Sequence, residues 1–143
     1  MKEIMDYEKC KKEHLQKVEP DTDKINSILK VAGVRLRAIQ QITKDAETTS
    51  IIVEGYYEII KELLVALLLK NGLKSDNHEC LISFLKAKYP NYDYESLIIH
   101  ELKNIRNRIN YDGIFVNPSY LNNNEHEFSH IIELLKQLIS DDD

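Results

Sequence analysis

The segment from Ala46 to Lys70 constrains the fold more than any other part of the chain. Its second half belongs to the run KELLVALLLKNG at 61–72, which is apolar on nearly all sides and ends in Asn71-Gly72, a C-terminal helix signal. A helix that is apolar all round has to be enclosed by other elements. We therefore expect 46–70 to be the central helix of the domain. Its longest apolar run, Leu63 to Leu69, is too short to cross a bilayer, so we expect no membrane span.

Helical spacing predicts further helices on both sides of this segment. Apolar residues recur at steps of three and four most clearly in 21–44, and the same pattern is weaker near the N-terminus. The loop 114–124 contains Pro118 and three asparagines, and we expect 114–116 to be briefly extended. The pattern predicts a single domain, 1–143, with an all-α fold: an antiparallel bundle of five to six helices. The expected helices besides the central one are 2–17, 21–44, 78–88, 93–111 and 125–139.

Composition limits the classes of partner. The formal net charge is −5, so the chain lacks the basic footprint of proteins that bind nucleic acid through overall charge, and any such contact has to be local. Cys10 and Cys80 have neither metal-ligand nor redox spacing. We expect reduced thiols in a cytoplasmic protein. Met1 precedes a charged segment, so we expect no secretory signal.

The sequence NIRNRINYDG, residues 104–113, places unusual hydrogen-bonding capacity at the end of an amphipathic helix. Asparagine is a poor helix former, so three of them here need a reason. Asn110 lies one turn beyond Arg106, and Asn107 and Tyr111 are i, i+4 neighbours, which makes a polar band beside the core. This band could contact phosphates or base edges. Alternatively, the arginine and the asparagines cap backbone groups at the helix end.

Three stretches of the chain resemble the HEPN-domain family, the all-α proteins found in prokaryotic toxin–antitoxin pairs, in CRISPR-associated ribonucleases and beside minimal nucleotidyltransferases. They are EPDTDKINSILKVAGVRLRAI (19–39), EGYYEIIKELLVALLLKNGLKSDNHECLISFL (54–85) and ELKNIRNRINYDGIFV (101–116), about half of the chain. The last is similar to the family motif, in which Arg and a polar residue, usually Asn, are followed by His within a few positions. Arg106 and Asn107 match this motif, and Tyr111 stands at the His position.

The resemblance implies a HEPN-like fold and a metal-independent ribonuclease site without a cofactor. Its catalytic positions would be Arg106, Asn107 and Tyr111, and Arg108 and Asn110 would contact nucleic acid. It also implies a homodimer in which both motif helices line one cleft. Histidine exchanges protons near neutrality because its pKa is about 6.5. Tyrosine, with a pKa of about 10, is a poor general base, so nuclease activity by the usual route is open.

Two functions follow from the resemblance. The first is an RNA-binding or endoribonuclease-like protein of toxin–antitoxin type. The second is a non-catalytic partner, or a modification target, of a minimal nucleotidyltransferase. In some relatives a tyrosine two residues after the motif His receives nucleotidyl groups. Gly113 occupies that position here, and Tyr111 lies nearby.

Several other residues have two readings. His126 and His130 in HEFSH match the zinc-binding pattern H-E-x-x-H, but the short remaining chain leaves little room for a third ligand, so we expect no metal. His78 follows a helix-cap sequence and has a structural or a site-edge role, and the resemblance places a His here in many relatives. The remaining expectations are that His100 is partly buried and hydrogen-bonded, that Tyr56-Tyr57 belongs to the core or an interface, and that Glu54 faces Arg106.

Overall fold

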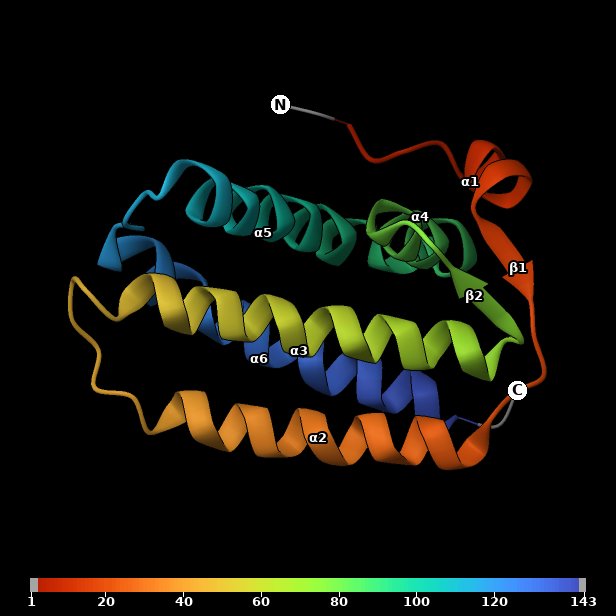
Figure 1. Ribbon diagram of the computed structural model, residues 1–143, viewed down its shortest axis with the longest axis horizontal. Coiled ribbons are helices and arrows are strands. Elements are labelled where there is room, and N and C mark those ends of the chain that lie inside the picture. Colours follow the sequence, from red (N-terminus) through yellow and green to blue (C-terminus); the bar gives the residue numbers. More distant parts are fainter. Residues whose placement is uncertain (1–2, 142–143) are drawn as a thin grey trace.

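The helix α3 (Thr49–Lys70) is the central element, as its sequence predicts. The computed structural model describes residues 3–141. In it α3 lies between α2 (Thr22–Gln40) on one side and α4 (His78–Lys88) and α5 (Asp93–Asp112) on the other, with α6 (Pro118–Ser140) packed behind it (Figure 1). Most of the side chains of α3 are buried, including Ile59, Ile60, Leu63 and Leu67, and one face that carries Glu54, Glu58, Lys61 and Glu62 stays partly exposed. Burial of most of its circumference explains why the second half of α3 is so largely apolar.

The remaining elements confirm an all-α bundle. Each long helix runs in the direction opposite to the long helix before it, so α2 and α5 are antiparallel to α3 (Figure 1). Among residues 3–141, none of the helices has both the length and the apolarity that crossing a bilayer requires. The other helices are α1 (Tyr7–Glu13), α2 (Thr22–Gln40), α4 (His78–Lys88), α5 (Asp93–Asp112) and α6 (Pro118–Ser140), with a 3-10 turn, η1 (Pro90–Tyr92), before α5.

Close contact between α2 and α3 depends on a glycine. A Cβ atom built on Gly55 would lie 2.5 Å from Cγ2 of Ile39, a distance that real Cβ atoms do not reach. The missing side chain therefore lets the two helix backbones approach each other. Helix α2 ends at Gln40, earlier than the expected residue 44, and α3 begins at Thr49 instead of Ala46. The connection between them is held by Asp45, whose carboxylate accepts hydrogen bonds from the backbone N–H groups of Glu47 and Thr48, both 2.9 Å.

The N-terminal segment differs from the expected helix over 2–17. Helix α1 ends at Glu13, and the next residues form a strand, β1 (Leu15–Lys17), that pairs antiparallel with β2 (Leu73–Ser75), Leu15 opposite Ser75. Strand β2 comes just after α3 in the chain, so its pairing with β1 attaches the N-terminal segment beside the end of the central helix. A strand of three residues leaves almost no periodicity in a sequence, which is why the expected helix extended past the end of α1. Residues 1 and 2 lie outside the described range.

The two cysteines form a disulfide, which corrects the expectation of reduced thiols. Helix α1 packs on α4 and brings the Cα atoms of Cys10 and Cys80 within 5.6 Å, inside the range that a disulfide requires. The bond joins residues separated by 70 positions, so no local motif announces it. It fixes the N-terminal arm, residues 3–18, to the helix that follows β2.

Helix α6 begins seven residues earlier than expected. Asn117 caps it, because its side chain accepts a hydrogen bond from the Ser119 backbone N–H at 2.9 Å, and Pro118 occupies the first helical position. The asparagines at 122–124 are therefore helical. The segment 114–116 forms no strand, and the backbone N–H of Val116 donates to Ser50 Oγ at 2.9 Å, which attaches it to α3.

Candidate functional site

The last two turns of α5 hold Arg106 between the helix and α3. Ile105 and Ile109 pack against the core, and Gly113 ends the helix with φ of 63°, a left-handed conformation that favours glycine. Arg106 Nη2 donates to Glu58 Oε1 at 3.1 Å, and the guanidinium lies over the Tyr57 ring, 5.3 Å from its centroid. The Arg106 side chain keeps 23 % of its surface exposed. It therefore has a structural partner and still reaches solvent.

Arg106 faces a pocket of about 390 Å³ where α3, the start of α4 and the end of α5 meet. The structure brings Arg106, Asn107 and Tyr111 together there, as the motif predicts. Arg106 Nη1 lies 3.4 Å from Asn107 Oδ1, which accepts its hydrogen bond. The pocket (here the Arg106 pocket) is lined by Tyr57, Asp76, Asn77, His78, Glu79, Lys103, Arg106, Asn107 and Tyr111.

Ion pairs hold the cations of this region in place. Lys103 pairs with Glu79 at 2.9 Å, and only 8 % of its side chain is exposed. Glu58 pairs with both Arg106 and Lys61, the latter at 2.7 Å. Burial opposes ionisation of Glu58, but the hydrogen bonds and positive charges of Lys61 and Arg106 outweigh it and hold the pKa of Glu58 below its usual value. The pocket thus combines cations with carboxylates that orient them.

The tyrosines of the pocket differ in exposure. Tyr57 is buried under the arginine, and burial raises its pKa to about 12, with Arg106 acting in the opposite direction, so it stays protonated at neutral pH. Tyr111 is 80 % exposed at the rim of the pocket. Tyr56 is buried in the core and its hydroxyl donates to Glu125 Oε2 at 2.8 Å. The pair Tyr56-Tyr57 therefore belongs to the core, one of the two readings its sequence left open.

His78, for which the sequence left a structural or a site-edge role open, lines the Arg106 pocket. It is the first residue of α4, where Asn77 Oδ1 accepts from the Glu79 backbone N–H at 2.8 Å, and it is exposed at the rim of the Arg106 pocket. Partial burial and the charges of Lys61 and Arg106 lower the pKa of His78, against the opposite effect of Glu58 and Glu62. The cap sequence before His78 predicts its helix position, but not its proximity to Arg106.

Two expected nucleic-acid contacts do not reach this pocket. Arg108 and Asn110 are exposed, and neither lines the Arg106 pocket. Arg108 lies instead beside a shallow hollow of about 620 Å³ on the outer side of α5. Glu54 was expected to face Arg106, but the carboxylate partner is Glu58, one turn further along α3. The band predicted on one flank of α5 is therefore divided between two faces.

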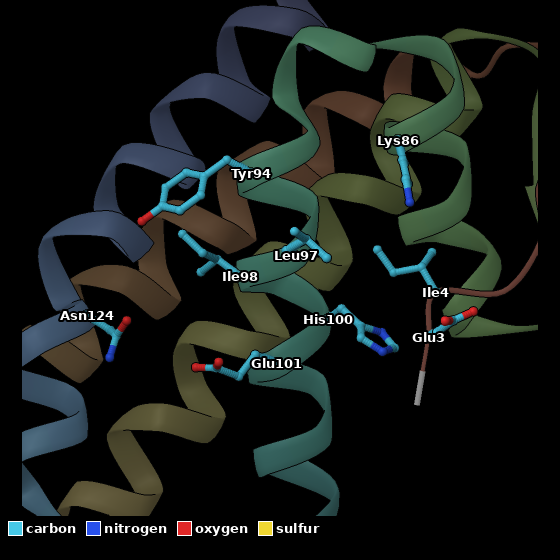
Figure 2. Close-up of a pocket in the computed structure, with 9 residues that line it drawn as sticks. All are labelled: Glu3, Ile4, Lys86, Tyr94, Leu97, Ile98, His100, Glu101 and Asn124. Carbon is cyan, nitrogen blue, oxygen red and sulfur yellow. The ribbon is translucent and has the colours of Figure 1, made fainter. Parts of the chain in front are cut away.

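An exposed stripe follows the outer side of α5. It consists of residues spaced by three and four, which share one face of a helix. Figure 2 shows its first half, where Tyr94, Leu97 and Glu101 line a hollow of about 700 Å³ between Ile4 of the N-terminal arm and Asn124 of α6. Tyr94 and Leu97 are 61 % and 51 % exposed. This outer stripe comprises Tyr94, Leu97, Glu101, Asn104, Arg108 and Tyr111, all exposed except the half-buried Asn104.

The HEFSH residues lie on the surface of α6. His126 and His130 are exposed, and His130 Nε2 lies 3.8 Å from Glu95 Oε2 of α5. Within residues 3–141, no cluster of three or more His, Cys, Asp or Glu side chains is arranged to hold a metal ion. His100 is buried on α5, more completely than the partial burial expected of it.

No family model matches this chain, and neither a curated protein nor a solved structure matches it.

Proposed function

We propose that the protein is a HEPN-like RNA-binding protein of toxin–antitoxin type, with an endoribonuclease-like site at the Arg106 pocket. The observation that carries the proposal is the meeting of Arg106, Asn107 and Tyr111 around a pocket that is open to solvent. These are the three residues that match the family motif or occupy its positions. A guanidinium that is held at one edge and partly exposed at the other suits a phosphodiester group.

Arg106 keeps N–H donors available for a phosphate group. The guanidinium carries five N–H donors in a planar fork, so its contacts with Glu58 and Asn107 leave others for phosphate oxygens. Tyr57 supports the guanidinium from below through a cation–π contact. Asn107 and Tyr111 add neutral hydrogen-bonding groups that can reach a ribose or a base. Because the net charge is −5, affinity comes from this local set and not from the surface as a whole.

The proposed homodimer pairs α5 with α5 of a second copy through the outer stripe. An antiparallel pair about a two-fold axis at Asn104 sets Leu97 opposite the second copy's Tyr111 and Glu101 opposite its Arg108. Apolar groups then meet apolar groups, and opposite charges meet. The axis runs normal to the plane of the two helices, so both Arg106 pockets open on the same face of the dimer. A single RNA strand could then contact both.

Cross-linking tests this register. Asn104→Cys places a thiol beside the axis, whereas Asn110→Cys places one on a different side of α5. Mild oxidation should give a covalent dimer with the first variant and much less with the second. The native Cys10–Cys80 pair is already bonded and does not compete. Equal cross-linking of the two variants, or a monomer in sedimentation of the unmodified chain, would remove the proposed interface.

RNA binding and cleavage without metal test the function itself. Arg106→Ala should weaken binding of a short RNA by about tenfold or more, since a hydrogen bond to a charged group contributes roughly 1.5–3 kcal/mol. Arg37→Ala, at an exposed arginine on α2 away from the pocket, is the matched control. Fluorescence anisotropy measures binding, and gel analysis in the presence of EDTA measures cleavage. If Arg106→Ala binds and cleaves as well as the unmodified chain, Arg106 is not the binding group.

A second function is favoured by the exposure of Tyr111. Its side chain is 80 % exposed, so a nucleotidyltransferase could reach the phenol. The chain would then be a partner and modification target of such an enzyme. Mass spectrometry after incubation with a minimal nucleotidyltransferase and ATP should find a nucleotidyl group on Tyr111 and none on Tyr94, which is exposed on the same helix. An unmodified Tyr111 would end this alternative.

A further inference from the structure

We propose that His78, at the start of α4, is the proton-accepting group of the Arg106 pocket and takes the part that Tyr111 is chemically unsuited to. The inference rests on the proposed function, because it assigns a role in RNA cleavage. It comes from the fold: His78 and Arg106 are distant in sequence, yet they line the same pocket with Asn107 and Tyr111. The fold therefore places an imidazole from α4 in the same pocket as the motif residues of α5.

The start of α4 holds His78 in a defined position. Asn77 caps the helix with its side-chain oxygen, and its own backbone N–H donates a hydrogen bond to Ser75 Oγ at 3.0 Å. Cys80, two residues further on, is fixed to Cys10 by the disulfide. Strand β2 leads into this turn and is itself paired with β1. A group that transfers protons needs such support, since small displacements weaken catalysis strongly.

The charges around His78 favour its neutral form, which is the form that accepts a proton. Partial burial lowers the pKa of His78 most, Lys61 on α3 and Arg106 on α5 lower it further, and Glu58 and Glu62 on α3 raise it less. Its position in the first turn of α4 acts in the same direction as the cations, because a helix N-terminus disfavours positive charge. The other charged groups of the pocket are Asp76, Glu79 and Lys103, and the last two pair with each other.

The step is a transesterification that needs neither a metal nor a redox partner. The imidazole of His78 accepts the proton of the ribose 2′-hydroxyl, and the 2′-oxygen forms a bond to phosphorus. The bond between phosphorus and the 5′-oxygen breaks, its electron pair stays on that oxygen, and water supplies the oxygen with a proton. The imidazolium then returns its proton to solvent. Arg106 stabilises the extra negative charge on the phosphoryl oxygens. The products carry a 2′,3′-cyclic phosphate and a 5′-hydroxyl.

The test compares His78→Gln with His126→Gln, an exposed histidine on α6, in the full-length chain with its disulfide intact. A short RNA oligonucleotide in EDTA is the substrate, and binding and single-turnover cleavage are measured from pH 5 to 8. Loss of a general base should slow cleavage by about 10²-fold or more and leave binding within about threefold. The unmodified chain and the control should show a rate that rises with pH through the His78 titration, and His78→Gln should lack this rise.

Each other outcome overturns the proposal in a distinguishable way. If His78→Gln cleaves like the unmodified chain, or keeps the same pH dependence, His78 is not the base, although the pocket still binds RNA. If the unmodified chain binds RNA but does not cleave it, His78 has no such role and only RNA binding stands. If it neither binds nor cleaves RNA, the proposed function fails as well. A thermal melt of each variant separates loss of folding from loss of chemistry.

Discussion

The guanidinium of Arg106 lies 5.3 Å from the centroid of the buried Tyr57 ring, so α5 contributes the charge and α3 contributes the surface that supports it. Glu58, the next residue of α3, binds the same guanidinium at 3.1 Å. The arginine is thus stacked on one side and paired at one edge. The position of the guanidinium therefore depends on both helices, at the place where they line the Arg106 pocket.

Acid should weaken the fold partly through Glu58. Its pKa in the folded chain is below the value of about 4.3 expected when unfolded, so Glu58 stabilises the fold above that pH. This contribution is lost as the pH falls through the folded-state pKa. Urea unfolding at several pH values between 3 and 7 should therefore show a steeper acid loss for the unmodified chain than for Glu58→Gln. Parallel pH profiles would contradict the pairing.

The same substitution should strengthen RNA binding. Glu58→Gln removes a negative charge beside Arg106 and releases one guanidinium edge for phosphate. We expect the affinity for a short RNA to rise by about threefold to tenfold, equivalent to roughly 0.7–1.4 kcal/mol. Anisotropy titration measures it, and Glu62→Gln on the same helix is the control. A weaker affinity would mean that Glu58 is needed to orient the arginine.

Reduction of the disulfide should destabilise the chain substantially. A bond that closes a loop of about 70 residues lowers the entropy of the unfolded chain, which corresponds to about 4 kcal/mol of stability. Urea unfolding with and without a thiol reductant measures the difference. The double variant Cys10→Ser, Cys80→Ser should be less stable and insensitive to reductant. Two free thiols in the denatured, unreduced chain would show that the bond does not form.

Two glycine-to-alanine substitutions should have opposite effects. Gly55→Ala forces a methyl group against Ile39 and should cost about 1–3 kcal/mol of stability. A Cβ at Gly33 on α2 finds its nearest neighbour, Arg37 Nη1, at 3.8 Å, so Gly33→Ala should stabilise the helix by about 0.5–1 kcal/mol. Thermal or urea unfolding compares them. Similar stabilities for the two variants would contradict the close packing of α2 on α3.

Tyr111→His should increase RNA cleavage without metal. Tyr111 is exposed at the rim of the Arg106 pocket, so an imidazole fits there without disturbing the core, and it accepts protons near neutral pH. We expect the rate to rise by about tenfold or more, and to do so also in the His78→Gln background. Tyr94→His, on the same helix but outside the pocket, is the control. An unchanged rate would mean that position 111 does not reach the reacting group.

The central helix could be predicted from the sequence because its apolar character is continuous and local. The start of α6 was expected seven residues too late, because the low helix propensity of three asparagines hid the Asn117-Pro118 start signal. The β1–β2 pair and the Cys10–Cys80 bond could not be predicted, since each joins segments about 60 to 70 residues apart. Contacts between segments so far apart produce no periodic pattern in the sequence.

The same distinction between local patterns and contacts of distant segments applies to the candidate site. The proximity of Asn107 and Tyr111 follows from helical spacing, and the edge position of Arg106 follows from its apolar neighbours. Tyr57 and His78 come from other helices, so only the packed fold brings them to Arg106. Arg108, two positions after Arg106, points elsewhere because each residue advances about 100° around the helix.

The pairing of β1 with β2 has a consequence for the order of folding. Strand β1 pairs with β2 and helix α1 packs on α4, so the arm can dock only once β2 and α4 are in place beside α3. Before the Cys10–Cys80 bond forms, closing such a long loop costs entropy that only the later contacts offset. We therefore expect the helical scaffold of the reduced chain to assemble first and the N-terminal arm to dock last, so that hydrogen exchange of the reduced chain would find the arm the earliest part to open.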